Sequence, residues 1–224
     1  MNIGLLGFGV VGGGVWELAQ ENRALNVKKV LVRREAPSLG KAAVQDVEAI
    51  LRDTEIDTVV EVLGGLHPAY EWICRALAAG KDVVTANKAV ISAYYRELTA
   101  LARENGVALR CTAAGGGGIP WLVNLQRCRR VDTVTEVGGI MNGTTNFIMD
   151  AMARQGADFP AVLQRAQELG YAEADPSADI DGDDIRRKLT ISANIAFDAL
   201  LREEDIPAFG IRTVTGADVA DFRA

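Results

Sequence analysis

Gly7-Phe8-Gly9-Val10-Val11-Gly12 forms a G-x-G-x-x-G stretch, the pattern typical of a turn that binds a dinucleotide. It follows a short apolar run, Asn2–Leu6, and precedes apolar residues at helical spacing, so it lies between a predicted strand and a predicted helix. In this context the first glycine permits a tight turn, the second lets the backbone approach a pyrophosphate, and the third allows close packing of helix on strand. Gly7, Gly9 and Gly12 are therefore candidate cofactor-binding residues, although a purely structural turn has the same pattern.

The first half of the chain alternates between strand-like and helix-like segments. Strands are predicted at Asn2–Leu6, Val27–Val32, Thr58–Leu63, Asp82–Thr85 and Val107–Cys111. Helices are predicted after the glycine-rich turn, over Val44–Leu51, between Pro68 and Gly80, and over Ala93–Glu104. Strands that alternate with helices form parallel sheets covered on both faces. The predicted fold class is therefore α/β, with a Rossmann-type doubly wound parallel sheet.

The pattern changes after Gly115–Gly118. A strand is predicted over Thr133–Met141, and Asn142-Gly143 is typical of a turn. Helices are predicted at Phe147–Arg154, Ala161–Leu169 and Ile185–Leu201. We therefore predict a dinucleotide-binding domain over residues 1–112, followed by a second region of α+β type over residues 113–224.

The end of the second predicted strand bears on the choice of cofactor. An NAD site usually has an acidic residue about 20 positions after the glycines, where it holds the ribose hydroxyls. Here the strand ends in Val32-Arg33-Arg34, and a guanidinium suits a 2′-phosphate through charge-assisted hydrogen bonds. The sequence therefore favours NADP through Arg33 and Arg34, while the nearby Glu35 keeps NAD open. A solvated pair of arginines is the other interpretation.

Composition excludes several classes of partner. The formal net charge is −6, and no basic block argues for a nucleic-acid partner. No apolar stretch is long enough for a membrane span, and no signal peptide is recognisable at the N-terminus. The three cysteines, which lack C-x-x-C spacing, are expected to be reduced thiols. These features predict a cytoplasmic protein with a small-molecule partner.

Two lysines are candidates for chemistry. Lys88 follows the predicted strand Asp82–Thr85, and ligands of doubly wound sheets bind at the carboxyl ends of strands. An exposed lysine that opens a helix is the alternative. Lys188 lies four residues after Asp184 on a predicted helix, so the two share a face. The acidic run before them lacks the spacing of a calcium loop, and we expect its carboxylates to hold a substrate ammonium instead.

Several motifs occur in the order found in one enzyme family. They are Gly7–Gly12, Val60-Glu61-Val62-Leu63-Gly64-Gly65, Gly80–Lys88, Gly116-Gly117-Gly118-Ile119-Pro120, Asn142-Gly143-Thr144-Thr145-Asn146 and Gly170–Lys188. With them the chain resembles homoserine dehydrogenases over nearly its whole length. The resemblance implies reversible NAD(P)-dependent oxidation of L-homoserine to L-aspartate 4-semialdehyde, in threonine, methionine and isoleucine biosynthesis. It also implies that the second region binds substrate and forms a homodimer.

The resemblance also implies roles for individual residues. Lys188 matches the catalytic proton donor and acceptor, with Lys88 and Asp184 as further catalytic residues. The residues implied in substrate binding are Gly143, Thr144, Tyr171, Glu173 and Asp179. Those implied in cofactor binding, besides the three glycines, are Phe8, Val10, Val11, Arg33, Lys88 and Asn142. The backbone carbonyls of Gly115, Gly117 and Ile119 are implied in a sodium site.

The chain departs from the family pattern in two places. Thr112 stands where the family often has a glutamate that contributes to the sodium site. The family normally continues beyond the position of Ala224 with strands that complete the substrate sheet, so we expect an incomplete C-terminal region. Two other interpretations stay open, namely an inactive or regulatory dinucleotide-binding relative and a reductase of another small semialdehyde.

Overall fold

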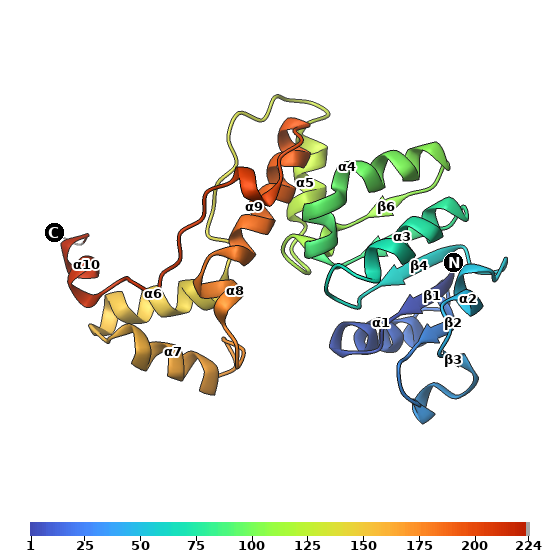
Figure 1. Ribbon diagram of the computed structural model, residues 1–224, viewed down its shortest axis with the longest axis horizontal. Coiled ribbons are helices and arrows are strands. Elements are labelled where there is room, and N and C mark those ends of the chain that lie inside the picture. The colour runs from blue at the N-terminus through green and yellow to red at the C-terminus, as the bar shows by residue number, and fades with distance from the viewer. Residues whose placement is uncertain (223–224) are drawn as a thin grey trace. The chain divides into compact units, whose positions relative to one another are not determined.

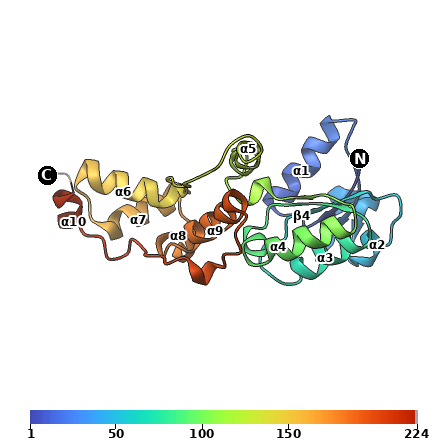
Figure 2. The same ribbon diagram turned by 90° about the horizontal axis from the view of Figure 1, so that it is seen from above.

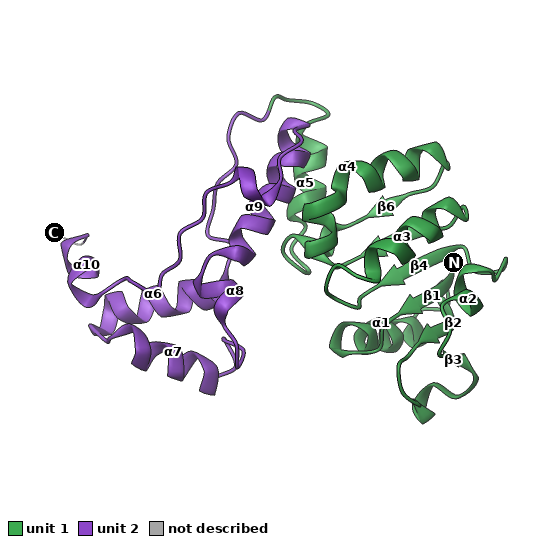
Figure 3. Cartoon of the chain, viewed as in Figure 1, with its two compact units in different colours: residues 1–133 green, residues 134–224 purple. Residues whose placement is uncertain are grey.

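The computed structural model describes residues 1–222. The chain divides into two compact units, Met1–Thr133 and Val134–Ala224 (Figure 3). The first unit contains the parallel sheet, and the described part of the second unit is built from helices and loops. The division into a dinucleotide-binding domain and a second region after residue 112 stays a prediction, and the compact units of the structure meet at residues 133 and 134.

The first unit is built on a six-stranded parallel sheet in the order β3-β2-β1-β4-β5-β6. Its strands are β1 Asn2–Leu6, β2 Asn26–Leu31, β3 Ala43–Val44, β4 Thr58–Glu61, β5 Asp82–Thr85 and β6 Leu109–Arg110. The order reverses between β1 and β4, and this switch point is where doubly wound sheets bind ligands. The predicted Rossmann-type sheet is confirmed. The two-residue strand β3 ends at Val44, the first residue of the segment predicted to be helical, and that segment is helical only over Glu48–Leu51.

Helices cover both faces of this sheet (Figure 1). They are α1 Val10–Glu21, η1 Pro37–Ala42, α2 Glu48–Leu51, α3 Ala69–Ala78, α4 Lys88–Glu104, η2 Thr112–Ala114 and α5 Trp121–Cys128. Helix α1 packs on one face, and α3 and α4 pack on the other (Figure 2). The central strands are apolar and β-branched because both of their faces are buried, as Leu5, Val59 and Val83 show with no exposed surface.

The second unit is a small helical assembly in its described residues. Its helices are α6 Gly143–Gln155, α7 Phe159–Glu168, α8 Ser177–Ile180, α9 Asp183–Phe197, η3 Glu203–Asp205 and α10 Gly216–Asp221. Ile148 and Met152 of α6 pack with Val162 and Ala166 of α7 and with Ile180 of α8 in one buried cluster. Gly156 ends α6 in the left-handed conformation, with φ 63°, which glycine adopts without strain.

The structure corrects two predictions at the start of this unit. Thr133–Met141 was predicted to be a strand, but it has no regular structure, and no other strand is present among residues 134–222 to pair with it. A β-strand needs a neighbour for its backbone hydrogen bonds, so a favourable sequence alone does not form one. Asn142-Gly143 is not a turn but the start of α6, with Asn142 as the N-cap.

No helix within residues 1–222 combines the length and apolarity that a membrane span requires.

Candidate active site

The glycine-rich turn connects β1 to α1. Gly7 has φ 107°, in the region that side-chain-bearing residues rarely adopt. A Cβ added at Gly12 would lie 2.3 Å from the carbonyl oxygen of Gly7, so a side chain there would separate helix from strand. A Cβ at Gly9 would meet no protein atom within 4 Å. Protein packing therefore accounts for the first and third glycines, whereas Gly9 faces open space beside the start of α1.

The N-terminus of α1 is suited to an anion. Gly9 is the N-cap and offers no side-chain acceptor, and the first turn contains no acidic residue. The first backbone N–H groups of a helix have no partner within it and carry partial positive charge. Val10 and Val11 are exposed, at 96% and 55%, which is unusual for valines and leaves this end of the helix open to a ligand. Phe8 is half-buried against the core.

Arg33 and Arg34 follow the end of β2. Both side chains are exposed, and Val32 before them is held by a hydrogen bond from its N–H to the carbonyl of Val44, at 2.9 Å. Both residues therefore follow β2 at the same sheet edge as the glycine-rich turn, because the carboxyl ends of parallel strands share an edge.

Lys88 is the first residue of α4, directly after the carboxyl end of β5. Its side chain is half-buried. The preceding residue, Asn87, is the N-cap, and its side-chain oxygen accepts a hydrogen bond from the Val90 N–H at 3.2 Å. Lys88 thus follows the carboxyl end of β5 as predicted, although the helix was predicted to begin only at Ala93, and its role in the site stays a prediction.

In the second unit, Asp184 and Lys188 form a buried ion pair on α9. Lys188 Nζ lies 2.8 Å from Asp184 Oδ2, and the two side chains are 19% and 3% exposed. Lys188 Nζ also donates to the carbonyl oxygen of Met141, at 2.6 Å. Asn142 Nδ2 donates to the same Asp184 oxygen, at 2.8 Å. The ammonium group is thus held by one carboxylate and one carbonyl, at a site that is only partly open to water.

Asn142 and Thr144 connect this pair to Asp179. Asn142 Nδ2 donates to Asp179 Oδ1 at 2.7 Å, while its Oδ1 caps α6 by accepting from the Thr145 N–H at 2.8 Å. Thr144 Oγ1 lies 2.6 Å from the Tyr171 carbonyl oxygen and 3.1 Å from Asp179 Oδ2. Five predicted residues from three separate stretches of sequence therefore lie together, namely Asn142, Thr144, Asp179, Asp184 and Lys188. The contribution of the Met141 carbonyl was not predicted, because no sequence pattern marks a single carbonyl.

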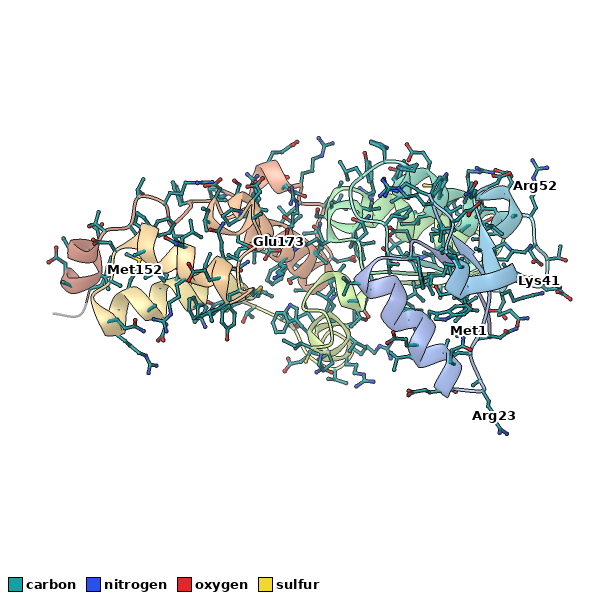
Figure 4. The ribbon with its side chains drawn as sticks, turned by 90° about the horizontal axis from the view of Figure 1, so that it is seen from below. Met1, Arg23, Lys41, Arg52, Met152 and Glu173 are labelled. Atoms are coloured by element: carbon teal, nitrogen blue, oxygen red, sulfur yellow. The ribbon has the colours of Figure 1, made fainter. Side chains whose placement is uncertain are left out.

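Other predicted substrate residues lie at the surface of this unit. The side chain of Glu173 is exposed (Figure 4), and its backbone carbonyl accepts a hydrogen bond from Gln167 at 3.1 Å. The Tyr171 ring is 56% exposed and stacks on Phe147 with 4.6 Å between ring centroids. Gly143 is exposed as the first residue of α6. The roles of these three residues in substrate binding stay predictions.

The segment proposed for sodium begins in η2. The N–H of Gly115 bonds to the carbonyl of Thr112, and the N–H of Gly117 to that of Ala113, each at 3.3 Å. The carbonyl of Ile119 accepts from the Trp121 N–H at 2.8 Å. Within residues 1–222 no group of three or more histidine, cysteine or acidic side chains is placed to hold a metal ion. A sodium site formed by the backbone carbonyls of Gly115, Gly117 and Ile119 would not use such side chains, and it stays a proposal.

Both parts of the chain match models of one family. Residues 7–112 match the model described as "Homoserine dehydrogenase, NAD binding domain", and residues 120–224 match the model described as "Homoserine dehydrogenase". The chain belongs to the homoserine dehydrogenase family. The first unit is accordingly the nicotinamide dinucleotide-binding part of this family's architecture, as the glycine-rich turn predicts.

Individual homoserine dehydrogenases agree with this assignment. The Synechocystis enzyme is 43% identical over 98% of this chain, which covers 54% of the relative. The solved structure of a homoserine dehydrogenase from Thiobacillus denitrificans has a TM-score of 0.93 and 39% identity, covering 100% of this chain and 55% of that one. A hyperthermophilic archaeal homoserine dehydrogenase solved in complex with NADPH has a TM-score of 0.81 and 27% identity, covering 95% and 74%. The chain spans about half the length of the curated relatives it matches.

Proposed function

We propose that this chain carries the homoserine dehydrogenase reaction, the reversible oxidation of L-homoserine to L-aspartate 4-semialdehyde with a nicotinamide cofactor. The proposal rests on the cluster of Lys188, Asp184 and Asn142. In this cluster the Asp184 carboxylate holds the ammonium group of Lys188 at a partly exposed position. Family membership supplies the substrate. The product places the enzyme in threonine, methionine and isoleucine biosynthesis.

The protein's own groups divide the work of this reaction. The bound cofactor supplies the hydride acceptor. Lys188 accepts the proton of the substrate hydroxyl at Nζ while it is a neutral amine, and it thereby becomes the ammonium group that the Asp184 carboxylate and the Met141 carbonyl hold. We propose Lys88, with its positive charge, as a further catalytic residue. We propose that Asp179, which accepts hydrogen bonds from Asn142 and Thr144, binds the polar end of the amino acid. The other residues proposed for this role are Gly143, Tyr171 and Glu173.

The glycine-rich turn fits the pyrophosphate of the cofactor. A doubly negative group suits this end of α1 for two reasons. There is open space beside Gly9, and the first backbone N–H groups of a helix have no partner within it. We propose Phe8, Val10, Val11 and Asn142 as further cofactor-binding residues. Arg33 and Arg34 support NADP as the preferred cofactor, with NAD also accepted. We further propose a cytoplasmic homodimer, with sodium bound by the carbonyls of Gly115, Gly117 and Ile119.

A direct assay tests the activity. The full chain is mixed with L-homoserine and either NAD or NADP, and the near-ultraviolet absorbance of the reduced nicotinamide is followed. Homoserine-dependent absorbance supports the proposal. Cofactor binding without turnover would instead identify a dinucleotide-binding relative that lacks the activity, and turnover of a different small alcohol at a higher rate would identify a reductase of another semialdehyde. Replacing sodium chloride with potassium chloride tests the sodium site.

Arg33→Ala tests the choice of cofactor. Loss of a charge-assisted hydrogen bond costs about 1.5–3 kcal/mol, so the dissociation constant for NADP is expected to rise roughly 10- to 100-fold. The constant for NAD is expected to change by less than about twofold, because its ribose carries no 2′-phosphate for the guanidinium to contact. Fluorescence titration of the reduced cofactors measures both constants.

Arg23→Ala is the matched control, because Arg23 is an exposed arginine after the far end of α1 (Figure 4). It is expected to leave both dissociation constants unchanged. Equal weakening of NAD and NADP by Arg33→Ala would contradict a specific contact with the 2′-phosphate, and the same titration on Arg34→Ala assigns the second arginine.

A further inference from the structure

Glu61 is a fully buried carboxylate at the end of β4. It has no exposed surface, although the rest of the strand consists of threonine and valine. Three hydrogen bonds reach its two oxygens. The Leu63 N–H donates to Oε1 at 2.8 Å, the Thr85 hydroxyl donates to Oε2 at 2.5 Å, and Asn87 Nδ2 donates to Oε1 at 3.3 Å. The carboxylate therefore connects its own strand with the end of β5 and the start of α4.

The network extends to both sides of this carboxylate. Asn87 Nδ2 also donates to the Gly65 carbonyl at 2.7 Å, and the Asn87 N–H donates to Thr85 Oγ1 at 2.9 Å. Gly64 and Gly65 both have positive φ, at 77° and 74°, so this loop has an unusual backbone path that needs support. The loop after β4 and the N-cap of α4 are thus fixed relative to each other through Glu61.

A carboxylate is an unfavourable choice if only stability matters. Burying it costs free energy, and an apolar side chain of similar volume often stabilises a core equally well. A carboxylate, unlike an apolar side chain, fixes the positions of its neighbours, because it accepts several hydrogen bonds in defined directions. The network lies at the carboxyl edge of the sheet, the edge at which ligands bind, and it includes Asn87, the residue directly before Lys88.

We propose that Glu61 is a positioning residue: through Thr85 and Asn87 it fixes the Leu63–Gly65 loop and the start of α4, and thereby holds Lys88 in place for the reaction. This proposal rests on the proposed dehydrogenase function. Glu61 itself does not contact substrate. Its loss is expected to lower kcat far more than it weakens cofactor binding or destabilises the fold.

The pair Glu61→Leu and Glu61→Gln tests this role in the full chain. Leucine fills the buried space but accepts no hydrogen bonds, so kcat is expected to fall about 100-fold, the effect of a misplaced reacting group. The melting temperature is expected to fall by only a few degrees, because the donors of Leu63, Thr85 and Asn87 lose their acceptor. Glutamine retains an oxygen for the Leu63 N–H, and the Thr85 hydroxyl can rotate to accept from its amide. Glutamine is therefore expected to restore kcat to within about tenfold of the original value. The dissociation constant of the reduced cofactor is expected to stay within about threefold in both variants, which is about 0.7 kcal/mol.

Two threonines provide a matched comparison. Thr85→Val removes the hydroxyl that donates to Glu61, and kcat is expected to fall about tenfold, the equivalent of one hydrogen bond. Thr58 is also buried, at 3%, but its hydroxyl donates to Asp57 at the other end of β4, at 2.7 Å. Thr58→Val is therefore expected to leave kcat unchanged.

Hydrogen–deuterium exchange provides a readout that does not depend on turnover. Peptides that cover residues 62–66 and 86–92 are expected to exchange faster in Glu61→Leu, whereas the rest of the sheet keeps its protection. Unchanged kcat in Glu61→Leu, or a parallel fall in kcat, cofactor affinity and melting temperature, would overturn the positioning role. If the unsubstituted chain shows no homoserine turnover, the dehydrogenase function fails, and unchanged exchange in Glu61→Leu would then overturn the positioning role separately.

Discussion

Lys188→Ala is expected to lower kcat by about 10²–10⁴-fold, the usual contribution of a positioned general acid or base. The Lys188 ammonium is only 19% exposed and is held by Asp184 and by the Met141 carbonyl, so the variant removes a proton-transferring group from a fixed position. The dissociation constant of the cofactor is expected to change by less than about threefold, because the glycine-rich turn belongs to the other compact unit. Steady-state kinetics and fluorescence titration measure the two quantities.

Arg154→Ala is the matched control for this variant. Arg154 also pairs with a carboxylate four residues earlier on a helix of the second unit, Asp150, but its side chain is 74% exposed. Exposed ion pairs of this kind contribute little to stability. Because the Arg154–Asp150 pair is not part of the cluster around Lys188, kcat is expected to be unchanged. If Lys188→Ala lost cofactor affinity and turnover to the same extent, proton transfer by Lys188 would be contradicted.

Gly9→Asp is expected to raise the dissociation constant of the cofactor by about 100-fold or more, about 2.7 kcal/mol, while the melting temperature stays the same or rises. Aspartate is a favourable N-cap, and its charge complements the start of α1, where no other acidic residue lies. A Cβ at this position meets no protein atom, so the fold accepts the side chain. The same carboxylate repels the pyrophosphate and occupies its space. Titration and thermal unfolding together test this opposition between stability and binding.

Gly12→Ala is the informative comparison. Its Cβ would lie 2.3 Å from the Gly7 carbonyl oxygen, so the helix must shift away from the strand and the melting temperature is expected to fall. A Gly9→Asp variant that binds the cofactor normally would show that the pyrophosphate lies elsewhere. A Gly9→Asp variant that unfolds would show that Gly9 is constrained by packing, against the open space observed here.

The sheet and the glycine-rich turn could be predicted because their signals are local. An apolar β-branched run identifies a buried strand wherever both faces are covered, and the predicted strand Asp82–Thr85 has the observed bounds. The predicted and observed boundaries of a helix differ where polar residues begin it. Helix α4 starts at Lys88 rather than Ala93, because its start is set by the Asn87 cap and not by the apolar pattern.

Predictions failed where an element depends on distant partners. Thr133–Met141 has a strand-like composition, but a ladder of hydrogen bonds requires another strand, which the described second unit does not contain. Helix α5, Trp121–Cys128, was not predicted from the sequence. The hydrogen-bond partners of Glu61 could not be predicted either, since they come from residues up to 26 positions away.

Asn142 couples local folding to the site it serves. One side chain both caps the first turn of α6 and bridges two carboxylates from other elements. A ligand that binds Asp179 and Asp184 and fixes the Asn142 amide also stabilises the first turn of α6. By linkage, an ordered α6 then increases the affinity for that ligand. Occupancy of the carboxylates should therefore be readable as a rise in the thermal stability of the second unit, so that calorimetry can report ligand affinity without any turnover.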